Sequence, residues 1–136
     1  MSITAIHGDP AAIAAGERVL MDLRDVCPSL VYAMLVTDDG FEIVRVPAAS
    51  DGGRFASMAS SMQALGDAVA RELAIGSSDY LVIASPTGHV IQRRVPGHAI
   101  VLSALFDDDE TLGKGLSVSR AAVEKLSALL GGGEGR

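Results

Sequence analysis

Apolar side chains recur along the chain with two spacings, and these spacings divide it into helices and strands. Steps of three and four residues place apolar side chains on one face of an α-helix, and they cover 10–27, 54–75 and 111–130. Asp9-Pro10 suits the start of the first helix, because aspartate accepts hydrogen bonds from the free amides of the first turn and proline fits the first helical position. Pro28 ends this helix, and Gly76 ends the second, as is typical of glycine at a helix C-terminus.

Between the predicted helices, short apolar or alternating runs predict strands. They cover 30–37, 41–46, 79–85, 89–95 and 99–106. The first and last runs are apolar nearly throughout, so we expect both strands to be covered on two faces and the last to lie centrally in the sheet. Tight-turn residues join neighbouring runs, which predicts hairpins. The expected fold is an α/β domain of the α+β type, a mainly antiparallel five-stranded sheet with helices on both faces and the order α-β-β-α-β-β-β-α.

Composition indicates one globular domain. The chain has 136 residues, of which 49% are hydrophobic and 21% charged, a balance typical of folded chains. We expect a flexible N-terminus over 1–9, the domain over 10–130 and a disordered tail over 131–136. No apolar run approaches the ~20 residues that span a bilayer, and no secretory leader is recognisable. The single cysteine, Cys27, fits a reducing compartment, so we expect a cytoplasmic protein without membrane insertion.

The charge balance bears on possible partners. The net charge of −6 gives a surface that nucleic acid repels on average, because binding a duplex relies on lysine and arginine neutralising phosphates. The same argument disfavours anionic membrane surfaces. We therefore expect no nucleic-acid partner.

The sequence offers no convincing catalytic, cofactor or metal site. His89 and His98 fall on turns that a hairpin could bring together, but further metal ligands are lacking. The acidic run 107–110 lacks the spacing of a calcium loop, and we expect it to stabilise the start of the last helix. Gly113-Lys114-Gly115 does not fit the phosphate-binding loop pattern. We expect a protein that is not an enzyme and that uses no cofactor and no metal.

Arg93 and Arg94 are the remaining charged pair of interest. They are adjacent on a predicted strand, so their side chains should point to opposite faces of the sheet. Two interpretations stay open: one arginine contacts a phosphate or switch loop of a partner, or both are solvated surface charges.

Three stretches in order resemble the Roadblock family of dynein light-chain-like domains: LVYAMLVTDDGFEIV, FASMASSMQALGDAVARELAIG and AIVLSALFDDDETLGKGLSVSRAAVEKLSALL. The resemblance covers about 13–130. It implies a profilin-like sheet with the middle helix on one face and the first and last helices on the other. It also implies a homodimer, in which the third strands pair edge to edge and the middle helices lie side by side. The bacterial proteins it resembles are MglB-type partners of small Ras-like GTPases, some of which are GTPase-activating, and the eukaryotic ones are dynein adaptor chains or scaffolds for Rag-type GTPases.

The middle helix has two candidate contact faces. We expect its large apolar residues to cover the sheet, and its small residues to let a second copy approach closely. The alternative is that the small-sided face simply meets water. The third strand, if it is a sheet edge, is apolar enough to need a cover. The predicted dimer contacts are Met58, Ala59, Met62, Gln63, Gly66, Tyr80 and Val82.

These observations lead to a primary hypothesis and two alternatives. The first is a non-catalytic homodimeric module that binds a small Ras-like GTPase and modulates its nucleotide state. The second is a dimeric adaptor or scaffold without a GTPase partner. The third is a small-ligand sensor, which requires a well-formed cavity with convergent polar groups.

Overall fold

A five-stranded antiparallel sheet forms the centre of the computed structural model, which describes residues 6–48 and 53–131. The strands are β1 (Leu30–Thr37), β2 (Glu42–Val46), β3 (Leu81–Ser85), β4 (Gly88–Arg94) and β5 (Ile100–Asp107). Their order across the sheet is β2-β1-β5-β4-β3. β5 is thus the middle strand, flanked by β1 and β4, and its predicted central position is confirmed. β2 and β3 form the two edges.

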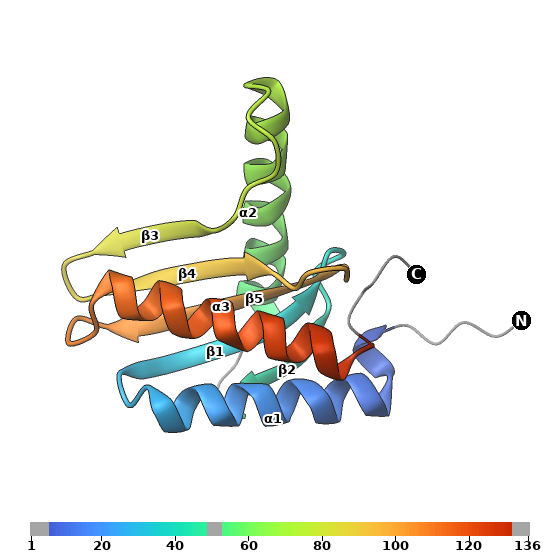
Figure 1. Cartoon of the computed structure of the whole chain (residues 1–136), viewed down its shortest axis with the longest axis vertical. Helices are drawn as coiled ribbons and strands as arrows, with labels where there is room; N and C mark the ends of the chain where they lie inside the picture. Colours follow the sequence, from blue (N-terminus) through green and yellow to red (C-terminus); the bar gives the residue numbers. More distant parts are fainter. Residues whose placement is uncertain (1–5, 49–52, 132–136) are drawn as a thin grey trace, which may run out of the picture.

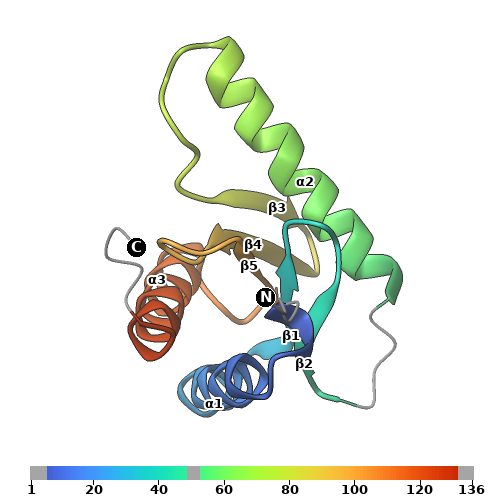
Figure 2. The same cartoon turned by 90° about the vertical axis from the view of Figure 1, so that its right-hand side faces the viewer.

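Helices cover both faces of the sheet. They are α1 (Pro10–Val26), α2 (Gly53–Glu72) and α3 (Leu112–Leu129), preceded by a 3₁₀ turn, η1 (Ile6–Gly8). α1 and α3 lie on one face and α2 lies on the opposite face (Figures 1 and 2). The predicted order of elements and the predicted fold class are confirmed.

The starts of α1 and α3 are set by local side chains. The Asp9 carboxylate accepts a hydrogen bond from the amide of Ala11 at 3.2 Å, with Pro10 in the first helical position. The Thr111 hydroxyl accepts one from the amide of Lys114 at 3.2 Å. Each bond satisfies an amide that the helix itself leaves free. The cap of α3 is therefore Thr111, and not the acidic run before it.

The main core lies between the sheet and the pair α1 and α3. It is built almost entirely from aliphatic side chains together with Phe106, which is fully buried. α1 approaches the sheet closely at Gly16, where an added Cβ would lie 2.8 Å from the Leu35 side chain. Glycine at this position thus allows the helix to pack directly on β1.

α2 packs on the other face of the sheet through small side chains. Ala56 and Ala59 are buried against Met34, Val36 and Val101. Of the large apolar residues of α2, only Phe55 in the first turns packs against this cluster, and Met58, Leu65 and Val69 are exposed. Our prediction that the large apolar face covers the sheet was therefore wrong for most of the helix. The sheet-facing side must be small because α2 crosses close above the strands. Its two apolar stripes are adjacent on the helix surface, and spacing alone does not tell which one is covered.

Polar contacts also hold α2 on the sheet, next to the buried alanines. The Gln92 side-chain amide donates to the carbonyl of Ala59 at 2.9 Å and to Gln63 Oε1 at 3.2 Å. Arg94 forms ion pairs with Asp67 of α2 at 2.8 Å and with Asp38 of the β1–β2 turn at 2.7 Å. Beyond these contacts, the C-terminal part of α2 extends past β3 (Figure 1).

Residues 6–8 form the 3₁₀ turn η1, and the His7 ring stacks on the Phe41 ring with centroids 4.4 Å apart. The flexible N-terminus expected over 1–9 stays a prediction. Residues 1–5 of that segment lie outside the described residues. So do residues 132–136, which make up most of the predicted disordered tail. Among the described helices, none combines the length and apolar character needed to cross a bilayer.

The orientation of α2 predicts unequal effects for the same substitution on its two sides. Ala59 is fully buried against the sheet and Ala64 is exposed. We expect Ala59→Leu to lower the free energy of unfolding by about 1–3 kcal/mol, because the added carbons overpack the interface. Ala64→Leu is the matched control and should change it by less than about 0.5 kcal/mol. Urea denaturation at one fixed protein concentration measures both, and equal effects would contradict the orientation.

Candidate interaction surface

Large apolar side chains are exposed along the outward side of α2. We call this set the α2 stripe: Met58, Leu65, Val69 and Leu73, continued by Ile75. Their side chains are between 47% and 71% exposed. Residues three and four apart on a helix are neighbours on its surface, so the helical members of the set follow one side of α2. Contiguous exposed apolar surface on a soluble domain marks a binding site or an aggregation hazard.

The edge strand β3 adds backbone groups to this surface. In the described chain β3 pairs only with β4, through residues 81–85 opposite 88–92. Its other side therefore presents unpaired amide and carbonyl groups, as sheet edges do. Leu81 lies against α2 at Gly66, and because side chains alternate along a strand, Ile83 also points to the α2 side. Ile83 is 50% exposed.

The predicted contact residues on α2 divide between two directions. Met58 and the half-buried Met62 belong to the outward side. Ala59 and Gln63 are buried against the chain's own sheet. Gly66 faces Leu81, whose side chain an added Cβ would meet at 2.9 Å. These last three positions serve the attachment of α2 to its own strands.

The two predicted residues near β3 also turn away from the α2 stripe. The Tyr80 ring covers the guanidinium of Arg93, 5.0 Å from its centroid. Val82 packs against the main core beneath α3. Their part in a dimer contact stays a prediction. Leu65, Val69 and Ile83 are exposed on this surface but are not among the predicted contacts, because the sequence does not tell which helix stripe the sheet covers.

The other residues considered as metal or phosphate ligands lie apart from this surface. His89 lies at the start of β4 and His98 beyond its end, so the two do not approach each other. The carboxylates of Asp107, Asp108 and Asp109 have oxygen atoms within 4.8 Å of one another. They lie on an exposed turn, where such clusters are common without an ion. Lys114 lies in the first turn of α3, as part of a helix and not of a loop.

Arg93 and Arg94 point to opposite faces, as predicted. Arg93 donates to Ser119 of α3 at 2.9 Å, and Arg94 reaches Asp67 of α2. Both side chains are half-buried and fixed by several contacts. The interpretation of both as free, solvated charges was therefore wrong.

Cys27 is part of a small polar cluster that ties the end of α1 to the loop before α3. Its buried thiol donates to Glu110 Oε1 at 2.9 Å, and the Ser29 hydroxyl donates to the same oxygen. These hydrogen bonds lower the pKa of Glu110. Burial, followed by the contact with Glu110, raises the pKa of Cys27. A thiol with a raised pKa holds its proton and is a poor nucleophile, so the cluster is structural.

This cluster predicts a pH-dependent contribution to stability. A carboxyl whose pKa is lowered by folding stabilises the protein above its unfolded pKa of about 4.3, and the contribution is lost as the pH falls below that value. We expect Glu110→Gln to lower the free energy of unfolding by about 1 kcal/mol near pH 7. The difference from the wild type should shrink near pH 3.5, as urea denaturation would measure.

Asp108→Asn is the control for this experiment. Asp108 is exposed on the same turn, and its change should stay within about 0.5 kcal/mol at both pH values. A difference between Glu110→Gln and the wild type that is independent of pH would contradict the role given to the carboxylate.

Solved structures show what this arrangement resembles. No family model matches the chain, and no curated protein matches it. The structure of the gliding protein mglB from Thermus thermophilus superposes with a TM-score of 0.77 at 20% identity, covering 89% of this chain and 92% of that one. A Roadblock/LC7 domain from Streptomyces avermitilis gives 0.75 at 16% identity, covering 83% and 95%. A chain of the LokiProfilin2/rabbit actin complex gives 0.59 at 16% identity, covering 83% and 96%.

These likenesses define the class of domain. The chain has the Roadblock/LC7-like fold, and MglB structures are among those that share it. The sequence resemblance is confirmed at the level of the fold, as is the expectation of a profilin-like sheet. At identities near one fifth, the likeness establishes the architecture, and function has to be argued from the surface.

Proposed function

We propose that this protein is a cytoplasmic, non-catalytic homodimeric module that binds a small Ras-like GTPase and modulates its nucleotide state. The observation that carries the proposal is the α2 stripe beside the unpaired edge of β3. A single chain leaves both uncovered: apolar side chains in water and backbone groups without strand partners. Both disadvantages are removed by one symmetric contact.

A two-fold axis beside β3 provides such a contact. Antiparallel pairing of residues 81–85 with the same residues of a second copy is self-complementary, as a two-fold interface must be. It extends the sheet across both subunits and satisfies the exposed edge. Because α2 extends past β3 (Figure 2), the overhanging helices then meet beyond the strands. In this arrangement, the α2 stripe of each copy is covered by the α2 helix of the other copy.

The GTPase part of the proposal is supported by the fold. The chain matches MglB structures over most of its length, and the sequence resembles the MglB-type partners of Ras-like GTPases. A rigid dimer offers a platform on which mobile switch loops are held in one arrangement. Any partner that binds one nucleotide state more tightly shifts the population towards it. This mechanism needs no catalytic group on the module.

The dimer is tested by one charge on the α2 stripe. Leu65 is 66% exposed, so Leu65→Glu should leave the monomer folded while placing a carboxylate in the apolar contact. We expect dissociation of the dimer to be favoured by at least about tenfold, because an unpaired charge is costly to bury. Sedimentation velocity over a dilution series measures this, and circular dichroism verifies the fold.

Ala64→Glu is the matched control for the dimer experiment. It adds the same charge to an exposed position outside the α2 stripe, and its dimer should dissociate like the wild type. Leu65→Glu chains that dimerise as strongly as the wild type would contradict the proposed interface.

Regulation is tested by titrating the wild-type protein with Ras-like GTPases of the same genome, each loaded with GTP or GDP. We expect one nucleotide form to bind more tightly, and hydrolysis or nucleotide exchange to change in rate when the module is present. Leu65→Glu should weaken this effect if the platform is the dimer. A dimer that binds neither form of any of them contradicts the regulatory role and favours the scaffold alternative.

A further inference from the structure

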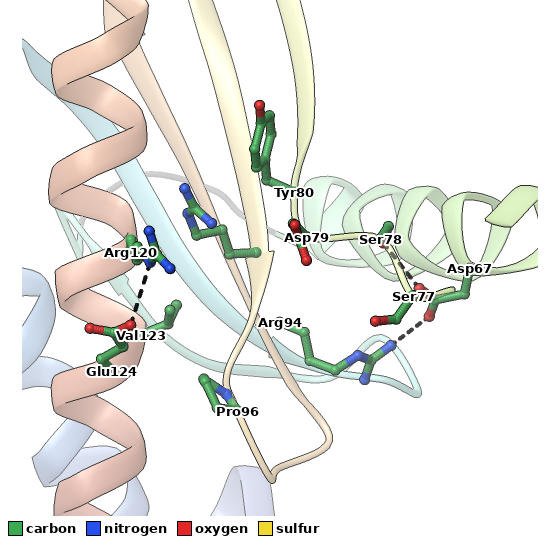
Figure 3. A pocket seen from close by; sticks show the side chains of 11 residues that line it. Asp67, Ser77, Ser78, Asp79, Tyr80, Arg94, Pro96, Arg120, Val123 and Glu124 are labelled. Atoms are coloured by element: carbon green, nitrogen blue, oxygen red, sulfur yellow. Dashed lines mark hydrogen bonds and ion pairs between the residues drawn. The ribbon is translucent and has the colours of Figure 1, made fainter. Parts of the chain in front are cut away.

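A cavity of about 390 Å³ opens beside the start of β3. Its walls come from the segment before β3, the end of β4 and α3, with Asp67 of α2 at one end. Figure 3 shows Arg120 and Glu124 on α3, with Asp79 and Tyr80 on the other side of the cavity. Arg93 also lines it. Nothing in the proposed function uses this cavity.

Arg93 is held in this cavity by neutral groups. Its Nε donates to the Ser119 hydroxyl at 2.9 Å, and its Nη2 donates to the carbonyl of Leu116 at 2.9 Å. The Tyr80 ring lies over the guanidinium at 5.0 Å, a distance at which the ring face attracts a cation. The guanidinium is therefore fixed in position without a carboxylate.

This arrangement distinguishes Arg93 from the other half-buried arginines of the described residues. Arg45 has Glu42 at 2.6 Å, and Arg94 has two aspartates within 2.8 Å. For both, an ion pair compensates for the loss of water around the charge. Among the described residues, the Arg93 guanidinium donates only to neutral oxygens, those of Ser119 and Leu116. Its charge is thus partly desolvated without a matching anion, which is costly unless a ligand supplies one.

A second guanidinium raises this cost. Burial lowers the pKa of Arg93, and repulsion from Arg120 lowers it further. Arg120 is itself only loosely paired, with its Nε 3.5 Å from Glu124 and both side chains well exposed. Asp79 and Glu124 offset part of this positive charge from the rim of the cavity. An anion between the two guanidinium groups relieves their repulsion and completes the hydrogen bonding of both.

We propose that this cavity binds a single oxyanion group, a carboxylate or a phosphate, between Arg93 and Arg120 with Tyr80 as its side wall. The carboxylates of Asp67, Asp79 and Glu124 also line the cavity, so they favour a small oxyanion over a ligand with many negative charges, such as a nucleoside triphosphate or a nucleic-acid backbone. The cavity admits an acidic side chain of a bound protein or a free inorganic phosphate. The proposal does not rest on the dimer, since no residue of the α2 stripe lines the cavity.

The test uses two probes that present the same chemistry from different sources. They are inorganic phosphate and a blocked tripeptide, acetyl-Gly-Glu-Gly-amide, whose only charge is the glutamate carboxylate. ¹⁵N NMR follows the Nε–H signal of Arg93 and the backbone amide of Tyr80, with sodium chloride at equal ionic strength as reference. We expect saturable shifts at both positions with at least one probe. A response to phosphate alone assigns a free phosphate, and a response to the peptide identifies a protein carboxylate as a sufficient ligand.

Variants make the assignment specific. Arg93→Gln should weaken binding by about tenfold or more, and Arg120→Gln by about threefold, since the latter is more exposed. Arg24→Gln, an exposed arginine on α1, is the matched control and should bind like the wild type. Because Arg120 makes no buried contact, its variant tests the site even if Arg93→Gln fails to fold. The proposal would be overturned if neither probe shifted the signals more than sodium chloride does. Unchanged affinity in Arg120→Gln would overturn it as well.

Discussion

The close approach of α2 to the sheet is the constraint on which the rest of the molecule depends. Where the helix meets the central strands, the small side chains of Ala56 and Ala59 are buried against Met34 and Val101. Apart from Phe55, which packs beside them, the large apolar residues of the same helix stay exposed or half-buried. Packing one side of α2 on the sheet therefore creates the exposed α2 stripe on another. The interior contact and the proposed interface are two consequences of one helix position.

Polar contacts fix where this helix points. Gln92 and Gln63 meet under α2, and Arg94 links Asp67 to the β1–β2 turn. Such contacts are directional, whereas apolar packing alone tolerates sliding. They hold α2 across the strands so that its end extends beyond β3 (Figure 1). The edge strand and the overhanging helix are thereby presented together, in an arrangement that a second copy can match.

The sequence predicts the architecture well because each element carries its own signals. Spacing and caps locate the helices, as at Asp9-Pro10, and continuous apolar runs identify β1 and β5 as central strands. The side of α2 that meets the sheet was not predictable, because both stripes repeat with helical spacing and differ only in side-chain size. The roles of Arg93 and Arg94 depend on Ser119, Asp67 and other partners far along the chain. Contacts between residues so far apart in the sequence cannot be predicted from the local spacing of apolar and polar residues.

Amide hydrogen exchange in β3 tests the central claim most directly. Every second amide between Leu81 and Ser85 faces away from β4, since hydrogen-bonding groups alternate along a strand. If two copies pair there, NMR should show these amides exchanging at least about tenfold more slowly at high protein concentration than after dilution. Core amides of β5 should be protected at both concentrations. Rapid exchange of the outward amides of β3 at every concentration, beside a protected β5, would contradict the account.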